Sequence, residues 1–199
     1  MLLSHTAQPM PHPWLNHRHG CPPPEVVERY RYTTPNLSMR MSALAAAIVR
    51  PQLPLLDERV ATWNDRYDRL AELLEADPRI RLPIRPDGEG AAPSSIQFSV
   101  LGPDGGAPDH DAMAGWLSVA ADHGVHIKWF GRDEPVGFTS RYDHWRYADE
   151  QVLHATSAVL AGLCDLRIPL CMTSDHCRDV AAVVRGALDL AGVEPVSRR

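Results

Sequence analysis

The chain has 199 residues, 44% of them hydrophobic, and a formal net charge of -5 at pH 7. This length suits one domain and is enough to bury a core. The acidic balance excludes the basic footprint of a nucleic-acid-binding protein, and no apolar stretch approaches the roughly 20 residues that a membrane span needs.

The first 24 residues predict an irregular arm, because they are rich in proline and histidine and show no periodicity. The next eight residues, 25–32, predict a short helix. Pro35 ends this helix because a proline disfavours the helical conformation at the preceding residue, Thr34. We therefore expect residues 25–199 to form the folded domain.

A long amphipathic helix is predicted over residues 38–75, where apolar residues recur at helical spacing. The stripe consists of Leu44, Ile48, Leu56, Val60, Trp63, Tyr67, Leu70 and Leu74. Pro51 and Pro54 interrupt it, so we expect a kink or a break near Arg50.

Beyond residue 78, short strands alternate with helices. Alternating apolar residues predict strands over 80–84, 95–100, 125–130 and 166–170. A helix over 109–123 should bury Met113, Trp116, Leu117 and Ala120 and end at Gly124. A last helix should start at a Ser174 cap, bury Cys177, Val180, Val184 and Leu188, and end at Gly192. The predicted fold class is α+β, with helices on one face of a mostly antiparallel four-stranded sheet.

Residues 30–74 also carry a motif that leads into the long helix. Its matching positions are Arg40, Met41, Ser42, Leu44, Ala46, Gln52, Leu53, Leu56 and Asp57. The segment resembles the start of the C-terminal small domain in the DegT/DnrJ/StrS family of fold-type I aminotransferases, which depend on pyridoxal phosphate. The resemblance extends to about Leu190 and implies the same α+β small domain. It also implies amino transfer, in many members onto a keto-sugar nucleotide.

The resemblance covers only part of such an enzyme. In the family, the lysine that holds pyridoxal phosphate as an imine lies upstream in a large domain, for which residues 1–24 leave no room. Lys128 is the one lysine of this chain and lies far outside the lysine motif of the family. One interpretation makes Lys128 a catalytic amine. Its place in an alternating strand favours the other, an ordinary strand lysine. We therefore expect the chain to lack the Schiff-base lysine and to be inactive alone.

Three residues before the long helix are candidates for coenzyme binding. In relatives, an asparagine of this turn reaches the coenzyme phosphate of the neighbouring subunit. The equivalent residue here is Ser38, with Asn36 two places earlier, and Arg40 faces the same region by resemblance. A hydroxyl or a free helix N-terminus can donate to phosphate. The alternative is that Asn36 and Ser38 serve only to cap the helix and that Arg40 is a solvated arginine of its first turn.

The long connection over residues 131–147 is the candidate substrate site. It is crowded with arginines and aromatic residues, which suit carboxylate or phosphate recognition. In fold-type I aminotransferases, an arginine of the small domain commonly holds the substrate carboxylate. Arg141 is the candidate for this role, with Tyr142 and His144 beside it. The alternative is that these residues only pack the loop against the sheet and a partner subunit.

Histidine and cysteine residues form two groups that could bind a metal, but neither has the ligand spacing of a known zinc site. They are His12, His17, His19 and Cys21, and Cys164, Cys171, His176 and Cys177. We expect no metal. The four cysteines include no C-x-x-C pair and follow no secretory signal, which indicates a reducing, cytoplasmic location.

Two hypotheses of function follow. The chain is either the detached C-terminal part of an aminotransferase, in which case residues 1–24 are a remnant of the upstream domain, or a non-catalytic binding module. The module would dimerise or pair with a full-length relative. The expected partners are a second copy or a chain that bears the large domain. Because the apolar stripe and the sheet face opposite the helices would normally meet such a partner, the isolated chain should self-associate or be marginally stable.

Overall fold

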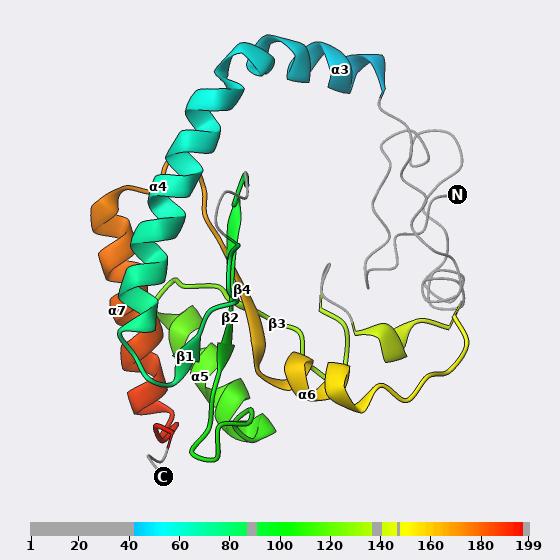
Figure 1. The fold of residues 1–199 in the computed structure, drawn as a ribbon, viewed down its shortest axis with the longest axis vertical. Helices are drawn as coiled ribbons and strands as arrows, with labels where there is room; N and C mark the ends of the chain where they lie inside the picture. Colours follow the sequence, from blue (N-terminus) through cyan, green and yellow to red (C-terminus); the bar gives the residue numbers. More distant parts are fainter. Residues whose placement is uncertain (1–41, 87–90, 137–140, 147, 197–199) are drawn as a thin grey trace.

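The computed structural model describes residues 42–86, 91–136, 141–146 and 148–196 (Figure 1). The predicted irregular arm over 1–24 and the short helix over 25–32 lie outside the described residues. So do the first residues of the long helix predicted over 38–75.

The long helix is broken where the prolines predicted a break. Helix α3 spans Ala43–Val49, the 3-10 helix η1 spans Arg50–Leu55 with Pro54 inside it, and α4 spans Leu56–Glu75. The Ser42 hydroxyl accepts a hydrogen bond from the Ala45 amide at 3.1 Å and so caps α3. Because proline cannot donate in a helix, the 3-10 turn redirects the chain, and α3 points away from the axis of α4 (Figure 1).

The sheet has four antiparallel strands in the order β1-β2-β4-β3. The strands are β1 (Ile80–Arg81), β2 (Ser95–Val100), β3 (Lys128–Trp129) and β4 (Leu163–Arg167). Alternation along β2 buries Ile96, Phe98 and Val100 on one face. The prediction of an α+β fold with a mostly antiparallel four-stranded sheet is confirmed.

Three helices cover the buried face of the sheet. They are α4, α5 (His110–Asp122) and α7 (Ser174–Leu190), with α4 and α7 side by side (Figure 1). The Trp116 ring of α5 meets Phe98 edge-on at 6.2 Å, and its indole N–H donates to the Val184 carbonyl of α7 at 3.0 Å. Each of the four residues predicted for the inner face of α5 is buried: Met113, Trp116, Leu117 and Ala120.

Several predicted boundaries are wrong. Strand β1 ends at Arg81, so Ile84 is 96% exposed instead of facing the core. Strand β3 has two residues instead of six. Strand β4 ends at Arg167 instead of continuing over 166–170, because Pro169 has no N–H to donate to a ladder.

Corrections also concern the helices. The cap of α7 is Thr173, whose hydroxyl accepts from the His176 amide at 3.2 Å, and not Ser174. Helix α6 (His154–Gly162) was not predicted; it precedes β4 and contacts β2, β3 and β4. Gly192, with φ of +68°, ends α7 as predicted, since a left-handed conformation favours glycine. No described helix is long and apolar enough to cross a membrane.

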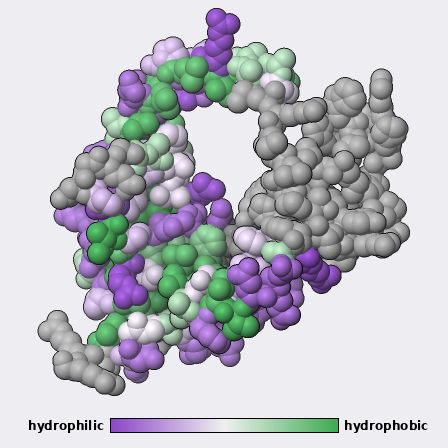
Figure 2. Space-filling model, turned by 45° about the vertical axis from the view of Figure 1, so that its right-hand side comes forward, coloured by the Kyte–Doolittle hydropathy of each residue, from purple (hydrophilic) through white to green (hydrophobic). Residues whose placement is uncertain are grey.

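The start of the amphipathic stripe has no cover among the described residues. We call residues 43–56 the projecting segment, and none of the residues of α3 or η1 is buried. Hydrophobic surface runs along it in Figure 2. Its large exposed apolar residues are Leu44, Ile48, Val49, Leu53, Leu55 and Leu56, from 42% to 71% exposed. Further along, Tyr67, Leu70 and Leu74 of the same stripe are buried.

Candidate functional site

The predicted substrate loop is organised around the guanidinium group of Arg141. This residue precedes the short 3-10 helix η2 (Tyr142–His144), which lies between β3 and α6. Two of its nitrogens donate to the Asp143 carboxylate, Nε to Oδ1 at 2.9 Å and Nη2 to Oδ2 at 2.6 Å. Nη1 donates to the Gly131 carbonyl at 3.3 Å and lies 3.4 Å from Asp133 Oδ1. The charge that would hold a substrate carboxylate is therefore already paired within the loop.

The pair between Arg141 and Asp143 shifts both pKa values. The hydrogen bond to Asp143 raises the pKa of the Arg141 guanidinium, against the opposing effect of burial. The same hydrogen bond lowers the pKa of the Asp143 carboxyl group. The pKa of Asp143 is lower in the folded state than in the unfolded state. The pair therefore stabilises the loop at pH values above the ordinary aspartate pKa, and this stabilisation is lost as the pH falls through the lowered pKa.

His144 and Tyr142 are also held inside the loop. The Arg141 amide donates to His144 Nδ1 at 3.1 Å, so Nδ1 carries no proton, and Nε2 donates to the Asp133 carbonyl at 2.8 Å. The Tyr142 hydroxyl accepts from the Leu153 amide at 3.2 Å and can donate to Ser157 Oγ at 2.9 Å, which ties η2 to the start of α6.

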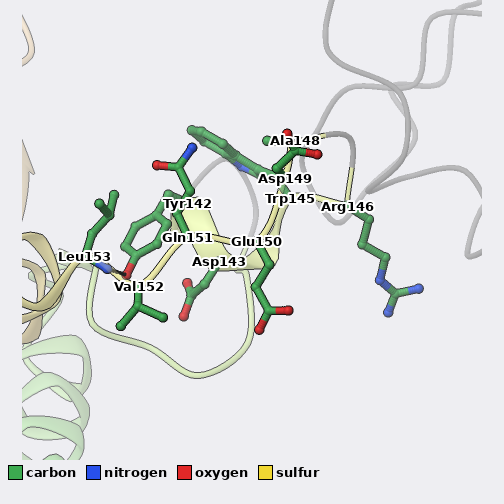
Figure 3. Close-up of a pocket in the computed structure, with 10 residues that line it drawn as sticks. All are labelled: Tyr142, Asp143, Trp145, Arg146, Ala148, Asp149, Glu150, Gln151, Val152 and Leu153. Atoms are coloured by element: carbon green, nitrogen blue, oxygen red, sulfur yellow. Dashed lines mark hydrogen bonds between the residues drawn. The ribbon is translucent and has the colours of Figure 1, made fainter.

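A hollow of about 670 Å³ opens beside this loop (Figure 3). Its lining includes Tyr142, Asp143, Asp149, Glu150 and Val152. The structure thus brings Arg141, Tyr142 and His144 together in one turn, but of these three only Tyr142 lines the hollow. Carboxylates outnumber cations around it, so the described lining suits an amine- or hydroxyl-bearing group better than a second carboxylate.

Two partners of the loop were not predicted. Asp133 Oδ2 lies 3.5 Å from Nε2 of His110, at the start of α5, and the His110 ring lies 4.9 Å from the Trp129 ring. The Arg132 guanidinium lies 5.9 Å from the centre of the same Trp129 ring, at cation–π range. Nothing in the sequence pairs His110 with Asp133, because 22 intervening positions separate them and only the fold closes the gap.

Gly131 permits the close packing of this region. A Cβ atom added there would lie 2.5 Å from Trp129 Nε1 and 2.9 Å from the Ala161 carbonyl oxygen. We expect Gly131→Ala to lower the free energy of unfolding by about 1–3 kcal/mol, because neither the indole nor the backbone of α6 can give way cheaply. Urea unfolding of the whole chain measures this.

Gly115 in α5 is the matched control. An added Cβ atom at Gly115 meets nothing within 4 Å. Gly115→Ala should therefore raise the free energy of unfolding by about 0.5–1 kcal/mol, since alanine is the better helix former. Equal effects of the two substitutions would show that Gly131 is not needed for packing.

The candidate coenzyme residues Asn36, Ser38 and Arg40 lie outside the described residues. Among the described ones, Lys128 is the only amine side chain, and its Nζ lies 3.9 Å from Asp165 Oδ1 in an ion pair on the sheet. Imine formation with pyridoxal phosphate requires a free amine and a cradle for the phosphate. The described residues therefore do not fit this coenzyme by themselves. They also contain no group of three or more histidine, cysteine, aspartate or glutamate side chains placed to hold a metal.

Residues 13–185 match the model of the DegT/DnrJ/EryC1/StrS aminotransferase family. Over 59 residues, the chain is 36% identical to 3-amino-5-hydroxybenzoate synthase of Amycolatopsis mediterranei (strain S699). This match covers 30% of the chain and 15% of the relative. The sequence similarity is therefore distributed over most of the chain, and the stronger identity is confined to a short part of it.

Solved structures of aminotransferases share the fold. The aminotransferase TlmJ from Streptoalloteichus hindustanus is 18% identical with a TM-score of 0.59, and the match covers 86% of this chain and 47% of that chain. DesI, solved in the presence of its TDP-sugar product, is 17% identical with a TM-score of 0.56, covering 76% and 38%. An aminotransferase from Brucella abortus is 15% identical with a TM-score of 0.54, covering 74% and 36%. The chain thus spans less than half the length of each.

Proposed function

The chain belongs to the DegT/DnrJ/EryC1/StrS aminotransferase family, and on this premise we propose that it contributes the C-terminal small-domain part of a pyridoxal-phosphate-dependent aminotransferase. The proposal rests on the family match over residues 13–185 and on the fact that the chain spans less than half the length of the solved aminotransferases. Residues 25–199 would form the small domain. A keto-sugar nucleotide is the proposed amino acceptor, and the cytoplasm is the proposed location.

We further propose that the 199-residue chain does not transfer amino groups alone. When bound, pyridoxal phosphate supplies the group that carries nitrogen between donor and acceptor. Support comes from Lys128, which lies on β3 beside Asp165 without a phosphate cradle among the described residues, and from the self-paired Arg141. In this proposal the role of η2 is to shape the rim of a site whose coenzyme is held by other residues.

Activity measurements test this directly. The purified chain is incubated with pyridoxal phosphate and with L-glutamate or L-glutamine, and loss of the amino donor is followed. We expect no turnover and no imine absorption band. Turnover by the wild-type chain that is lost in Lys128→Ala would contradict the proposal, because it would show that Lys128 serves as the catalytic amine.

A second function, as a module that pairs with a chain bearing the large domain or with its own copy, is favoured by the projecting segment. Six large apolar side chains there are exposed over a short stretch: Leu44, Ile48, Val49, Leu53, Leu55 and Leu56. Exposed apolar surface of this density marks interaction sites more often than it remains in water. Asn36, Ser38 and Arg40 would then reach the coenzyme of the partner.

Gel filtration of matched variants tests the pairing, with the chain alone and with a chain that bears the large domain. Leu44→Glu/Ile48→Glu should abolish self-association or co-elution, since charges would replace apolar contacts at positions 71% and 57% exposed. Leu190→Glu, at 73% exposure on α7, is the control and should leave the elution unchanged. If wild type elutes as a monomer in both settings, the pairing proposal fails.

A further inference from the structure

The sheet has a second face that α4, α5 and α7 do not cover. The register places Gln97, Asp165 and Lys128 in one row across β2, β4 and β3. Arg81 pairs with Ser99, and Ser95 pairs with Arg167, on the same face. We call these seven residues the outer sheet face. These seven residues are polar, whereas the opposite face of the same strands is the core. Leu163 of β4 lies on the same face opposite Ser99, and α6 borders its Arg81 end through Ala158 and Val159.

Two arginines of the outer sheet face have no partner in the part of the chain that the structure describes. Arg81 and Arg167 are exposed, and neither guanidinium forms a hydrogen bond or an ion pair there. Most other described arginines are paired with carboxylates: Arg66, Arg69, Arg79, Arg85, Arg141, Arg178 and Arg185. Two unpaired cations on one sheet face are notable in a chain whose net charge is -5.

A buried carboxylate holds a third cation on this face. Asp165 is 6% exposed, its Oδ1 has no hydrogen-bond partner, and Lys128 Nζ lies 3.9 Å from that oxygen. A buried charged carboxylate is unfavourable unless a cation compensates it. Asp165 therefore acts as a positioning residue that keeps the Lys128 ammonium, which is 34% exposed, at the middle strands of the face.

We propose that the outer sheet face binds an acidic polypeptide segment, whose carboxylates pair with Arg81, Arg167 and Lys128. The three cations lie on β1, β4 and β3, and the sheet order puts three strand spacings, roughly 14 Å, between its outermost strands. One phosphate or carboxylate cannot span this distance, but an extended segment can. A polynucleotide would be repelled by the overall negative charge and would meet too few cations.

This surface is separate from the projecting segment, and its binding does not depend on amino transfer. The probe is a fluorescein-labelled peptide of ten glutamates, titrated with the full chain at low salt and followed by anisotropy. Arg81→Glu/Arg167→Glu should weaken binding about tenfold, because each exposed ion pair contributes little but the reversal adds repulsion. Arg81→Gln/Arg167→Gln should weaken it about threefold.

The matched control is Arg69→Glu/Arg178→Glu, which changes the net charge equally on α4 and α7, away from the outer sheet face. Its affinity should stay within about twofold of wild type, and circular dichroism should show that all variants remain folded. Equal losses in both charge-reversal variants, no measurable binding by wild type, or tighter binding of a ten-nucleotide oligothymidylate would each overturn the proposal.

Discussion

Asp77→Ala is expected to lower the free energy of unfolding by about 3 kcal/mol, because it leaves the buried guanidinium of Arg79 without its main counter-charge. Asp77 is 4% exposed; its Oδ1 accepts from Arg79 Nε at 2.9 Å and its Oδ2 from Arg79 Nη2 at 2.7 Å. Arg79 Nη1 donates to the Val193 carbonyl at 3.0 Å. The pair therefore joins the turn after α4 to the end of α7. Urea unfolding should show a lower midpoint at an unchanged slope.

Asp189→Ala is the control for this pair. Asp189 Oδ1 also lies near Arg79 Nη2, at 2.8 Å, but its side chain is 71% exposed. Removing it should cost less than about 1 kcal/mol, since solvent screens an exposed ion pair. Similar losses for the two substitutions would show that burial of Asp77 does not determine the effect.

The stabilisation that Asp77 contributes should depend on pH in one direction only. Burial alone would raise the pKa of Asp77, but the hydrogen bonds from Arg79 outweigh it, and the folded-state pKa is lowered. A group with a depressed folded-state pKa stabilises the fold above its unfolded value and ceases to do so as the pH falls through the folded value. The difference between wild type and Asp77→Ala should therefore be constant near neutral pH and shrink only below about pH 4.

The elements that the sequence predicted best are those whose periodicity alone determines their burial. Along α5, the spacing of Met113, Trp116, Leu117 and Ala120 matches one helix face, and all four are buried. The break after Val49 was equally predictable, since Pro51 and Pro54 cannot sit inside an α-helix without loss of hydrogen bonds. Both depend on local chemistry that tertiary contacts do not override.

The strand boundaries depended on partners that a local pattern does not contain. Ile84 continues the alternation of β1, yet β1 pairs with β2 only at Ile80 and Arg81, so Ile84 is left exposed. In β4, Cys164 and Asp165 are paired by β2 and β3 although an aspartate is unusual in a strand. Helix α6 was missed because most of its residues are exposed and no side chain caps its start.

In the candidate site, too, the sequence predicted some features and could not predict those that depend on tertiary partners. The resemblance to aminotransferases is confirmed by the family match, whereas the substrate role predicted for the loop around Arg141 stays a prediction. Sequence spacing could not show that Asp143 and Asp133 occupy the Arg141 guanidinium, since either carboxylate could equally have faced solvent. The roles of Asn36, Ser38 and Arg40 stay predictions.

Trp116→Ala should lower the free energy of unfolding by about 4 kcal/mol, because it empties the centre of the layer between α5, α7 and the sheet. Trp116 is fully buried, packs edge-on against Phe98 and donates to the Val184 carbonyl. Trp116→Phe keeps most of the volume and loses the hydrogen bond, so it should cost about 1–2 kcal/mol. Leu190→Ala, at an exposed position of α7, should cost less than about 0.5 kcal/mol. If urea unfolding gave equal losses for the two Trp116 variants, the hydrogen bond to Val184, and not the packing of the indole, would dominate the stability of this layer.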